Sequence, residues 1–210
     1  MKTPITYYGG KQQMLKYILP MMPEHHVYVE PFFGGGAVFF GKEPAKIELI
    51  NDTNAEIVNF YKVLKSRFAE LKPLVDMTLY SEYQYKQARQ IYTHPDEYDD
   101  VHRAWAVWVL SHQSFYSNFT STWRCSKEDN TAAWLQSRKE AFTEDYCRRL
   151  SCRQNCYRQC KRRNTRISNL RCGYFFSSFY VLFTKQTAKD SVCVFCTFRF
   201  QILNLLFCYL

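Results

Sequence analysis

Apolar and polar residues in the N-terminal part of the chain alternate between helical and strand-like patterns. Residues 11–19 carry apolar side chains at helical spacing, which predicts a helix. We expect this helix to end before Pro20, because proline cannot continue a helix. Short β-rich runs at 27–30 and 46–52 predict strands, and residues 54–67 again have one apolar helical face. The order is helix, strand, glycine turn, helix, strand, acid, helix, which predicts the opening of a doubly wound α/β sheet.

The next part of the chain, up to about residue 150, follows a mainly helical pattern. The segments 81–92 and 99–112 have helical spacing, residues 113–130 are polar, aromatic and loop-like, and residues 131–150 are helical again. We interpret this stretch as a helical subdomain inserted into the α/β frame. The chain therefore divides into three parts, which are residues 1–65, 66–150 and 151–210.

The composition changes abruptly near residue 150. The chain has 210 residues and a net charge of +9; residues 1–150 carry 18 basic and 18 acidic residues, whereas residues 151–210 carry 10 basic residues and one acid. Seven of the nine cysteines lie in the second segment, and no proline follows Pro95. A second domain, a disordered basic tail or a translation that left its reading frame would each produce such a break. A frameshift is the simplest account, so we predict that residues 151–210 are out of frame.

Three consecutive glycines, Gly34 to Gly36, follow the first predicted strand, and three classes of ligand compete for such a turn. A dinucleotide loop has the pattern G-x-G-x-x-G, and here Phe39 stands at the third glycine position. A nucleoside triphosphate loop ends in Gly-Lys-Ser/Thr, and here Glu43 stands in place of the hydroxyl that binds Mg²⁺. Both matches are therefore partial.

An adenosyl ligand without phosphates is the third class, and it requires an acid at the end of the second strand for the ribose hydroxyls. Asp52 lies 18 residues after Gly34, close to the spacing of about 20 for ribose-binding acids. A carboxylate suits this task because it accepts hydrogen bonds from two adjacent hydroxyls. The alternative is a tight strand-to-helix turn in which Asp52 caps the following helix, although Asn54 is also placed as the N-cap of that helix.

Three motifs occur in order within a short stretch: YYGGK at 7–11, VEPFFGGGAVFF at 29–40 and INDTNAEIVNFYKVL at 50–64. With this combination the chain resembles the Dam-like (D12 class) family of adenine-specific DNA methyltransferases, closely over residues 5–65 and more loosely over 66–150. The resemblance implies methyl transfer from S-adenosylmethionine to the N6 amine of adenine in double-stranded DNA, in a restriction-modification or phage-like setting. It also implies a Rossmann-like S-adenosylmethionine-dependent methyltransferase core of the α/β class, with a helical target-recognition insert.

The resemblance also assigns roles to single residues. Those matched to the methyl-donor site are Tyr7, Lys11, Glu30, Pro31, Phe33, Gly34, Gly36 and Asp52. Of these, Tyr7 and Lys11 match the aromatic-x-GGK motif that lines the donor pocket, and Asp52 matches the acid that binds the donor's ribose. Two of them have simpler alternatives, since Lys11 could be a solvated lysine at a helix start and Phe33 could be a core residue. The candidates for DNA contact, in the loop of the insert, are Phe115, Tyr116 and Asn118.

The second motif of the family, Asp/Asn-Pro-Pro-Tyr/Phe, is missing, because the sequence contains no Pro-Pro pair. In the family this motif orients the N6 amine of a flipped-out adenine and stacks on the base. We therefore assign no catalytic residue and expect a core whose C-terminal part is incomplete, in a truncated and catalytically impaired chain. The alternatives are a non-catalytic DNA- or nucleotide-binding module and a nonfunctional truncated product.

The tail offers weak signals of its own. Cys152, Cys156 and Cys160 resemble the iron–sulfur triplet of radical S-adenosylmethionine enzymes, but the second gap is one residue too long, and CVFC at 193–196 is a single Cys pair. We therefore predict no metal site. Residues 191–210 are apolar but contain an arginine, which disfavours a membrane span. The N-terminus has no signal-peptide pattern, so we expect a cytoplasmic protein, and we expect a monomer.

Overall fold

The computed structural model describes residues 1–125, 130–151, 154–159, 181–187 and 190–196, with side chains up to residue 151. Within these residues the strands form a five-stranded sheet in the order β3-β2-β1-β5-β4. The strands are β1 (Val27–Glu30), β2 (Ile47–Asp52), β3 (Gln154–Gln159), β4 (Val181–Thr187) and β5 (Asp190–Cys196).

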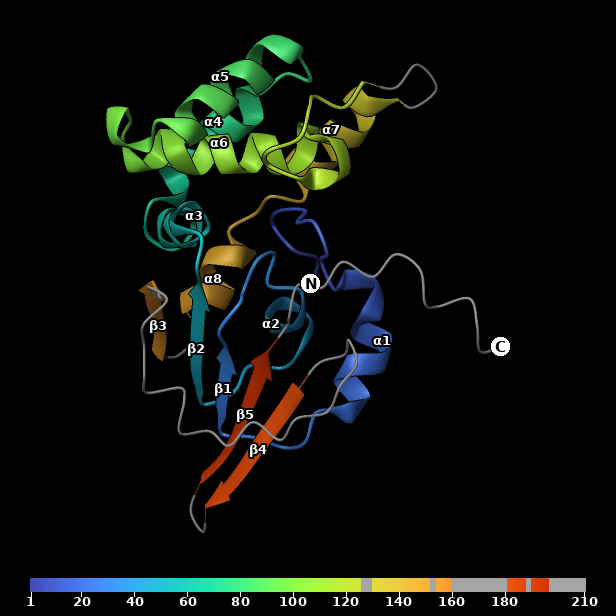
Figure 1. The fold of residues 1–210 in the computed structure, drawn as a ribbon, viewed down its shortest axis with the longest axis vertical. Helices are drawn as coiled ribbons and strands as arrows, with labels where there is room; N and C mark the ends of the chain where they lie inside the picture. The colour runs from blue at the N-terminus through green and yellow to red at the C-terminus, as the bar shows by residue number, and fades with distance from the viewer. Residues whose placement is uncertain (126–129, 152–153, 160–180, 188–189, 197–210) are drawn as a thin grey trace.

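Strand β1 lies in the middle of the sheet and pairs in parallel with β2 on one side and with β5 on the other. Strand β3 continues the parallel pairing beyond β2, and β4 runs antiparallel to β5. The carboxyl ends of β1, β2 and β5 therefore meet at one edge of the sheet, and this edge faces the helices in Figure 1. In open α/β sheets, ligands bind at this edge, at the point where the strand order reverses. Here that point lies beside the end of β1.

The N-terminal elements confirm the order that the sequence predicts. They are η1 (Gln12–Met14), α1 (Leu15–Ile18), η2 (Leu19–Met21), β1, α2 (Ala37–Gly41), β2 and α3 (Ala55–Ser66). Asn54 is the N-cap of α3, since its side-chain oxygen accepts a hydrogen bond from the backbone N–H of Glu56 at 3.0 Å. The α1 and α2 helices contact each other, and α3 contacts β2 and β3.

Residues 66–150 are mainly helical, and α4 to α7 form a layer beyond the carboxyl end of the sheet, whereas α8 lies beside the strands (Figure 1). The elements of the insert are α4 (Phe68–Met77), α5 (Glu82–Thr93), η3 (Pro95–Glu97), α6 (Asp100–Gln113), η4 (Phe115–Ser117), α7 (Thr131–Glu140) and α8 (Asp145–Ser151). Helix α6 is the centre of this layer, because it packs against α3, α4 and α5 and is buried on all sides from Ala104 to Gln113.

Two features of the insert differ from the sequence prediction. Helix α4 was not predicted, and it contains Pro73 in its interior, where proline removes a helical hydrogen bond. Its buried residues Leu71 and Val75 hold it in place. The predicted helix at 131–150 is two helices, α7 and α8. The chain turns between them and buries Phe142, whose ring contacts the rings of Phe68, Trp108 and Tyr146.

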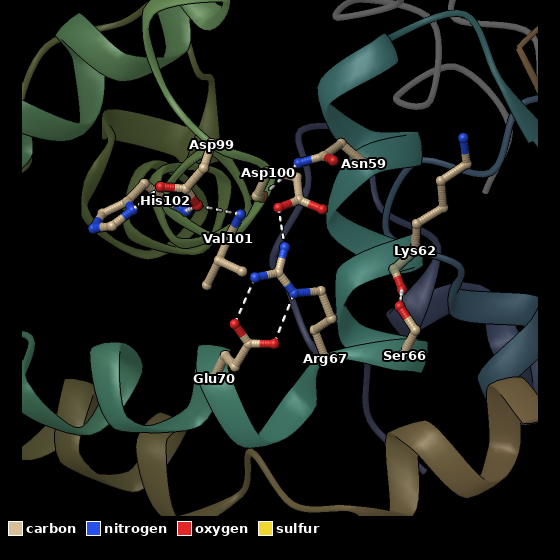
Figure 2. Close-up of polar contacts among 9 residues, drawn as sticks. All are labelled: Asn59, Lys62, Ser66, Arg67, Glu70, Asp99, Asp100, Val101 and His102. Carbon is tan, nitrogen blue, oxygen red and sulfur yellow. Dashed lines mark hydrogen bonds and ion pairs between the residues drawn. The ribbon is translucent and has the colours of Figure 1, made fainter.

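Polar contacts join α3 of the core to the first helices of the insert (Figure 2). The Arg67 guanidinium donates to both oxygens of Glu70, at 2.7 and 2.5 Å, and also to Asp100. Asn59 donates to the backbone carbonyl of Asp100 at 2.8 Å, and Asp99 caps α6. The charged side chains in this network are substantially exposed, so solvent screens their contribution to stability.

A buried ion cluster ties α8 to β2. Glu48, which is fully buried, accepts hydrogen bonds from Lys42 at 2.5 Å and from Arg149 at 2.5 and 3.0 Å. Burial alone would raise the pKa of Glu48, but the hydrogen bonds from Arg149 and Lys42 outweigh it and the pKa lies below the ordinary value. Because Leu150 is also fully buried, specific side-chain contacts extend to the residue at which the composition changes.

The tail contributes β3, β4 and β5, and β5 and β3 pair with β1 and β2. The described residues are consistent with a partial α/β core. Strand pairing uses backbone N–H and C=O groups, which any non-proline sequence supplies. Strand pairing alone therefore does not test the reading frame, and the out-of-frame origin of residues 151–210 stays a prediction.

The alternatives for the tail lie outside the described side chains, which end at residue 151. This holds for Cys152, Cys156, Cys160 and the pair at 193–196. Among the described residues, no three His, Cys, Asp or Glu side chains are grouped so that they could hold a metal ion. Across the part of the chain that the structure describes, no helix combines the length and apolar character that a membrane crossing requires. Residues 197–210 of the apolar segment are not described.

Candidate functional site

The glycine loop connects the end of β1 to the start of α2, and glycine is required at two of its positions. Gly34 has φ +50° and Gly36 has φ +66°, which are left-handed conformations. A Cβ atom on Gly36 would also lie 2.5 Å from the Phe33 ring. Residues 37–40, which correspond to the interior of a nucleoside triphosphate loop, are instead the buried first turn of α2. The loop is therefore a tight turn and lacks an extended phosphate cradle.

The end of β2 holds this loop in place. The backbone N–H of Phe33 donates to the carbonyl of Asn51 at 2.9 Å, and the Asn51 side chain donates to the carbonyl of Pro31 at 2.9 Å. The backbone N–H of Gly34 donates to Oδ2 of Asp52 at 2.7 Å. The loop after one strand and the acid at the end of the next are therefore joined directly.

Asp52 also contacts the start of α3. Its Oδ1 atom accepts a hydrogen bond from the backbone N–H of Asn54 at 2.9 Å, and the residue is 7% exposed. The alternative in which Asp52 caps α3 is wrong, because Asn54 occupies that position.

The YYGGK motif packs against the glycine loop. The backbone N–H of Gly10 donates to the carbonyl of Tyr7 at 2.8 Å, in a turn that requires the positive φ of Gly9. The Tyr7 ring covers Gly34 so closely that a Cβ atom there would lie 3.0 Å from it. Lys11 follows the turn and donates to the carbonyl of Gly9. Burial lowers the pKa of the Lys11 ammonium, and the charge of Glu30 partly opposes that change.

Glu30 is the last residue of β1 and is 3% exposed. Its Oε2 atom accepts a hydrogen bond from the Tyr28 hydroxyl at 2.7 Å. Burial raises the pKa of Glu30 to about 8, even though the Tyr28 bond and the charge of Lys42 favour the ionised form. Asp52 raises that pKa further by charge repulsion. The Glu30 carboxyl is therefore mainly protonated and neutral near pH 7.

The structure brings most of the predicted donor-site residues together at the carboxyl ends of β1 and β2. Those that gather there are Tyr7, Lys11, Glu30, Pro31, Gly34, Gly36 and Asp52. Phe33 differs, because its ring is 4% exposed and lies 4.7 Å from the Tyr61 ring and 5.3 Å from the Phe39 ring, between ring centroids. This is the core environment that we considered as the alternative for Phe33.

The predicted DNA-contact residues lie on a compact loop after α6. Phe115 and Tyr116 are 48% and 73% exposed, and their ring centroids are 4.3 Å apart. Tyr116 and Ser117 both have φ +54°, a strained conformation for side chains other than glycine. The Oδ1 atom of Asn118 accepts hydrogen bonds from the N–H and hydroxyl of Thr120 at 3.2 and 2.9 Å. The Asn118 side chain therefore helps to shape the loop itself.

Phe119 links this loop to the glycine loop, a role that the sequence did not indicate. Its ring is 6% exposed and makes edge-to-face contacts with Tyr7 and with Tyr92, both at 5.5 Å between centroids. The Tyr92 hydroxyl in turn accepts a hydrogen bond from the side chain of Asn54 at 2.9 Å. No signal distinguished Phe119 from the exposed aromatic residues beside it, because burial of one ring within a loop has no period.

Comparison with protein families gives a match over most of the chain. Residues 7–178 match the model of the D12 class N6 adenine-specific DNA methyltransferase family. The match spans the glycine loop, the insert and part of the tail.

Curated relatives match shorter stretches of the chain than the family model does. The chain is 36% identical over 111 residues to a DNA N-6-adenine-methyltransferase of Escherichia phage P1, which covers 51% of this chain and 14% of the relative. It is 44% identical over 68 residues to the Type II methyltransferase M1.LlaDCHI of Lactococcus lactis subsp. cremoris, covering 32% of this chain and 24% of that protein. A DNA adenine methylase of Vibrio cholerae is 38% identical over 58 residues, which are 28% of this chain and 21% of the relative. The chain thus aligns with less than a quarter of the length of each relative.

Proposed function

Because the chain belongs to the D12 class N6 adenine-specific DNA methyltransferase family, we propose that its glycine-loop site binds S-adenosylmethionine. Tyr7 and Lys11 form one wall of this site, the loop from Glu30 to Gly36 forms its floor, and Asp52 accepts hydrogen bonds from the ribose hydroxyls. Phe33 supports the loop from the core. S-adenosylmethionine supplies an activated methyl group when it is bound.

One observation supports this proposal above the others. The backbone N–H of Gly34 donates to Asp52 at 2.7 Å, with Tyr7 packed on the same glycine. Three segments far apart in the sequence therefore converge beside the end of β1, where open α/β sheets bind ligands. The neutral Glu30 carboxyl and the partly buried Lys11 give this region polar groups that can hold a ligand carrying both an amine and a carboxylate.

We propose double-stranded DNA as the partner and a monomer as the working unit. The helical insert, residues 66–150, is the recognition part, and the exposed pair Phe115 and Tyr116 contacts bases. Aromatic side chains suit this task, because each base has a π-face on which a ring can stack. Helix α6 connects this loop to α3, so the recognition part is positioned relative to the donor site.

These 210 residues contain no Pro-Pro pair and hence no acceptor motif for the adenine N6 amine. Orientation of the reacting atoms supplies much of the rate in group transfer. We therefore propose that this chain by itself binds the donor but does not transfer the methyl group efficiently, and we assign no catalytic residue.

Two alternatives remain beside this function. A non-catalytic DNA- or nucleotide-binding module would bind DNA, or a nucleotide other than S-adenosylmethionine, through the same surfaces. A nonfunctional truncated product would bind neither the donor nor DNA. Ligand preference separates the first alternative from the proposed function, and any specific binding excludes the second.

Isothermal titration calorimetry with the full chain tests the proposed ligand. S-adenosylmethionine should bind, and S-adenosylhomocysteine should bind in competition with it. NAD and ATP should bind much more weakly, because the loop has no extended phosphate cradle. Stronger binding of ATP or NAD than of S-adenosylmethionine would contradict the proposal and would support the nucleotide-binding alternative.

A further inference from the structure

Tyr92, on helix α5 of the insert, is connected to the acid at the end of β2 through a single residue. Its hydroxyl oxygen accepts a hydrogen bond from Nδ2 of Asn54 at 2.9 Å. The backbone N–H of Asn54 donates in turn to Oδ1 of Asp52 at 2.9 Å. The donor-site residues that the sequence predicts do not include Tyr92 or Asn54, so this connection adds a part of the insert to the region of the site.

The orientation of the Asp52 carboxylate depends on donors at both of its oxygens. The backbone N–H of Gly34 donates to Oδ2 at 2.7 Å, and the backbone N–H of Asn54 donates to Oδ1. A shift of either donor turns the carboxylate about the other. The strength of a hydrogen bond falls steeply with poor alignment, so such a turn weakens any bond that Asp52 accepts from a ligand.

Both ends of the Asn54 side-chain amide form hydrogen bonds. Its oxygen accepts from the backbone N–H of Glu56 at 3.0 Å and caps α3, and its Nδ2 atom donates to Tyr92. Capping requires only the oxygen, so the bond to Tyr92 is additional to the cap. This bond joins residues 38 positions apart. It therefore attaches the start of α3, which carries one of the donors to Asp52, to helix α5.

Packing holds Tyr92 in place. Its ring makes an edge-to-face contact with Phe119 at 5.5 Å between centroids, and Phe119 is 6% exposed. Burial raises the pKa of the Tyr92 hydroxyl, and the charges of Glu56 and Asp52 act in the same direction, although the bond from Asn54 opposes them. The hydroxyl is therefore neutral near pH 7, and its oxygen accepts the bond from Asn54 at a fixed position.

We propose that Tyr92 is a positioning residue for ribose recognition, which acts through Asn54 to hold Asp52 in the orientation that accepts hydrogen bonds from the ribose hydroxyls. The inference rests on the proposed S-adenosylmethionine site and adds a specificity-determining residue to it. Tyr92 itself is assigned no contact with the ligand. The preference of the site for a ribose over a deoxyribose therefore depends on a helix outside the α/β core.

The test removes the Tyr92 hydroxyl and keeps the ring. Tyr92→Phe loses the bond to Asn54 but keeps the edge-to-face contact with Phe119. Tyr83→Phe is the matched control, because Tyr83 lies on the same helix, is 71% exposed, and accepts a hydrogen bond from the side chain of Gln87. Calorimetry with the full chain measures the affinities for S-adenosylmethionine and S-adenosylhomocysteine. Competition titrations measure two analogues of S-adenosylhomocysteine, which lack the 2′ or the 3′ hydroxyl of the ribose.

Tyr92→Phe should bind S-adenosylmethionine and S-adenosylhomocysteine about two- to tenfold more weakly, which corresponds to one neutral hydrogen bond. The analogue that lacks the hydroxyl bound by Asp52 should lose less affinity, because the bond that Tyr92 supports is already absent. The ratio of the affinities for ribose and deoxyribose ligands should therefore fall in Tyr92→Phe. In Tyr83→Phe this ratio should equal that of the wild type.

Asn54→Ser tests the same connection from the other side. Serine is also a good N-cap, so α3 stays capped, but the Nδ2 donor to Tyr92 is removed. The ribose preference of Asn54→Ser should fall as it does in Tyr92→Phe. In a double-mutant cycle, Tyr92→Phe should cause no further loss of ribose preference when Asn54→Ser is already present, because both changes remove one interaction.

Several results would overturn the inference, and they separate it from the proposed function. If the wild type binds no S-adenosylmethionine, both fail. If the wild type prefers the ribose and Tyr92→Phe keeps that preference, only the inference fails. An equal loss of affinity for the ribose and deoxyribose ligands would give Tyr92 a role in the fold alone, which also overturns the inference. Thermal unfolding checks the fold of each variant, and Asn54→Ser tests the connection even if Tyr92→Phe does not fold.

Discussion

Two buried acids, Glu30 and Asp52, end neighbouring strands but have different hydrogen-bond partners. Asp52 accepts hydrogen bonds from two backbone N–H groups, so its position is determined by the glycine loop and the start of α3. Glu30 accepts hydrogen bonds from the Tyr28 hydroxyl and from the backbone of Phe39, yet burial raises its pKa to about 8. Backbone donors therefore hold the first acid in place, whereas the second is mainly protonated near pH 7.

The raised pKa of Glu30 predicts a pH dependence of stability. The unfolded chain releases this proton near pH 4.3, whereas the folded chain keeps it up to about pH 8. The stabilisation is therefore complete at low pH and is lost as the pH rises through that interval. The free energy of unfolding should fall by up to about 1.4 kcal/mol per pH unit. The lowered pKa of His112 acts in the opposite direction up to about pH 7.5, because unfolded histidine is still partly protonated there. This contribution is common to the wild type and to variants of Glu30.

Urea unfolding between about pH 6.5 and about pH 8 measures this effect. Glu30→Gln, which cannot ionise, should show a much smaller decline than the wild type. Glu24→Gln is the control, since Glu24 is exposed and precedes the same strand. An identical decline in the wild type and in Glu30→Gln would show that the Glu30 carboxyl is not the titrating group.

At the scale of elements, α8 is attached to the sheet by an ionic contact that depends on Arg149. Arg149 donates to Glu48 and to the backbone carbonyl of Phe39, and its guanidinium lies 3.7 Å from the Phe39 ring centroid. Arg149→Ala would leave part of the Glu48 charge buried without a partner. We expect a loss of about 3–5 kcal/mol in the free energy of unfolding.

The adjacent residue provides a matched control for this prediction. Arg148 pairs with Asp145 at the surface, so Arg148→Ala should change the free energy of unfolding by less than about 1 kcal/mol. Chemical unfolding of both variants measures the difference. If Arg149→Ala were no more destabilising than Arg148→Ala, α8 would not be anchored through Glu48.

The contact of Phe119 with Tyr7 predicts that the insert loop supports the donor site. Phe119→Leu keeps an apolar side chain but removes the edge-to-face contact, which is worth about 0.5–1.5 kcal/mol. We therefore expect a two- to tenfold loss of S-adenosylmethionine affinity by calorimetry. Phe115→Leu, at an exposed position of the same loop, should leave donor affinity unchanged and weaken DNA binding. Equal S-adenosylmethionine affinity in both variants would show that Phe119 does not support the donor site.

The spacing of apolar residues predicted the elements that keep one helical or strand-like period along their whole length. The strands predicted at 27–30 and 46–52, the helix capped by Asn54 and the insert helices α5 and α6 are of this kind. Helix α4 was not predicted, because Pro73 interrupts its local pattern and its stability depends on packing. The glycine loop was found through its glycines, but local sequence could not show that the Phe33 ring fills the space beside Gly36 or that Phe119 reaches Tyr7. Both features depend on contacts between distant segments.

At the scale of the whole molecule, the glycine-loop site lies between the sheet and the helical insert. The sheet supplies the loop and the acid, and the insert supplies the aromatic contact of Phe119 with Tyr7. The strands β3 and β5 flank this frame through backbone pairing. The proposed function assigns a methyl-donor site and a DNA-binding surface to this arrangement, whereas the sequence contains no acceptor motif.

A donor site without an acceptor motif predicts that the chain transfers no methyl group to adenine in DNA. A radiolabel assay with S-[methyl-³H]adenosylmethionine and duplexes of mixed sequence measures transfer, and a filter-binding control measures donor binding in the same sample. We expect donor binding without incorporation above background, because nothing orients the N6 amine towards the methyl group. Saturable methylation at a defined adenine would contradict this and would require an acceptor site elsewhere in the chain.

The central claim is that the glycine loop and Asp52 together form an S-adenosylmethionine site, and one titration tests it most directly. Calorimetry compares the wild type with Asp52→Ala and with Asp96→Ala, an exposed acid in the insert. Asp52→Ala loses the charged hydrogen bonds to the ribose, so its binding free energy for S-adenosylmethionine should be weaker by about 1.5–3 kcal/mol. Asp96→Ala should bind S-adenosylmethionine like the wild type. Equal S-adenosylmethionine affinity in all three folded proteins would remove Asp52 from the site and contradict the account.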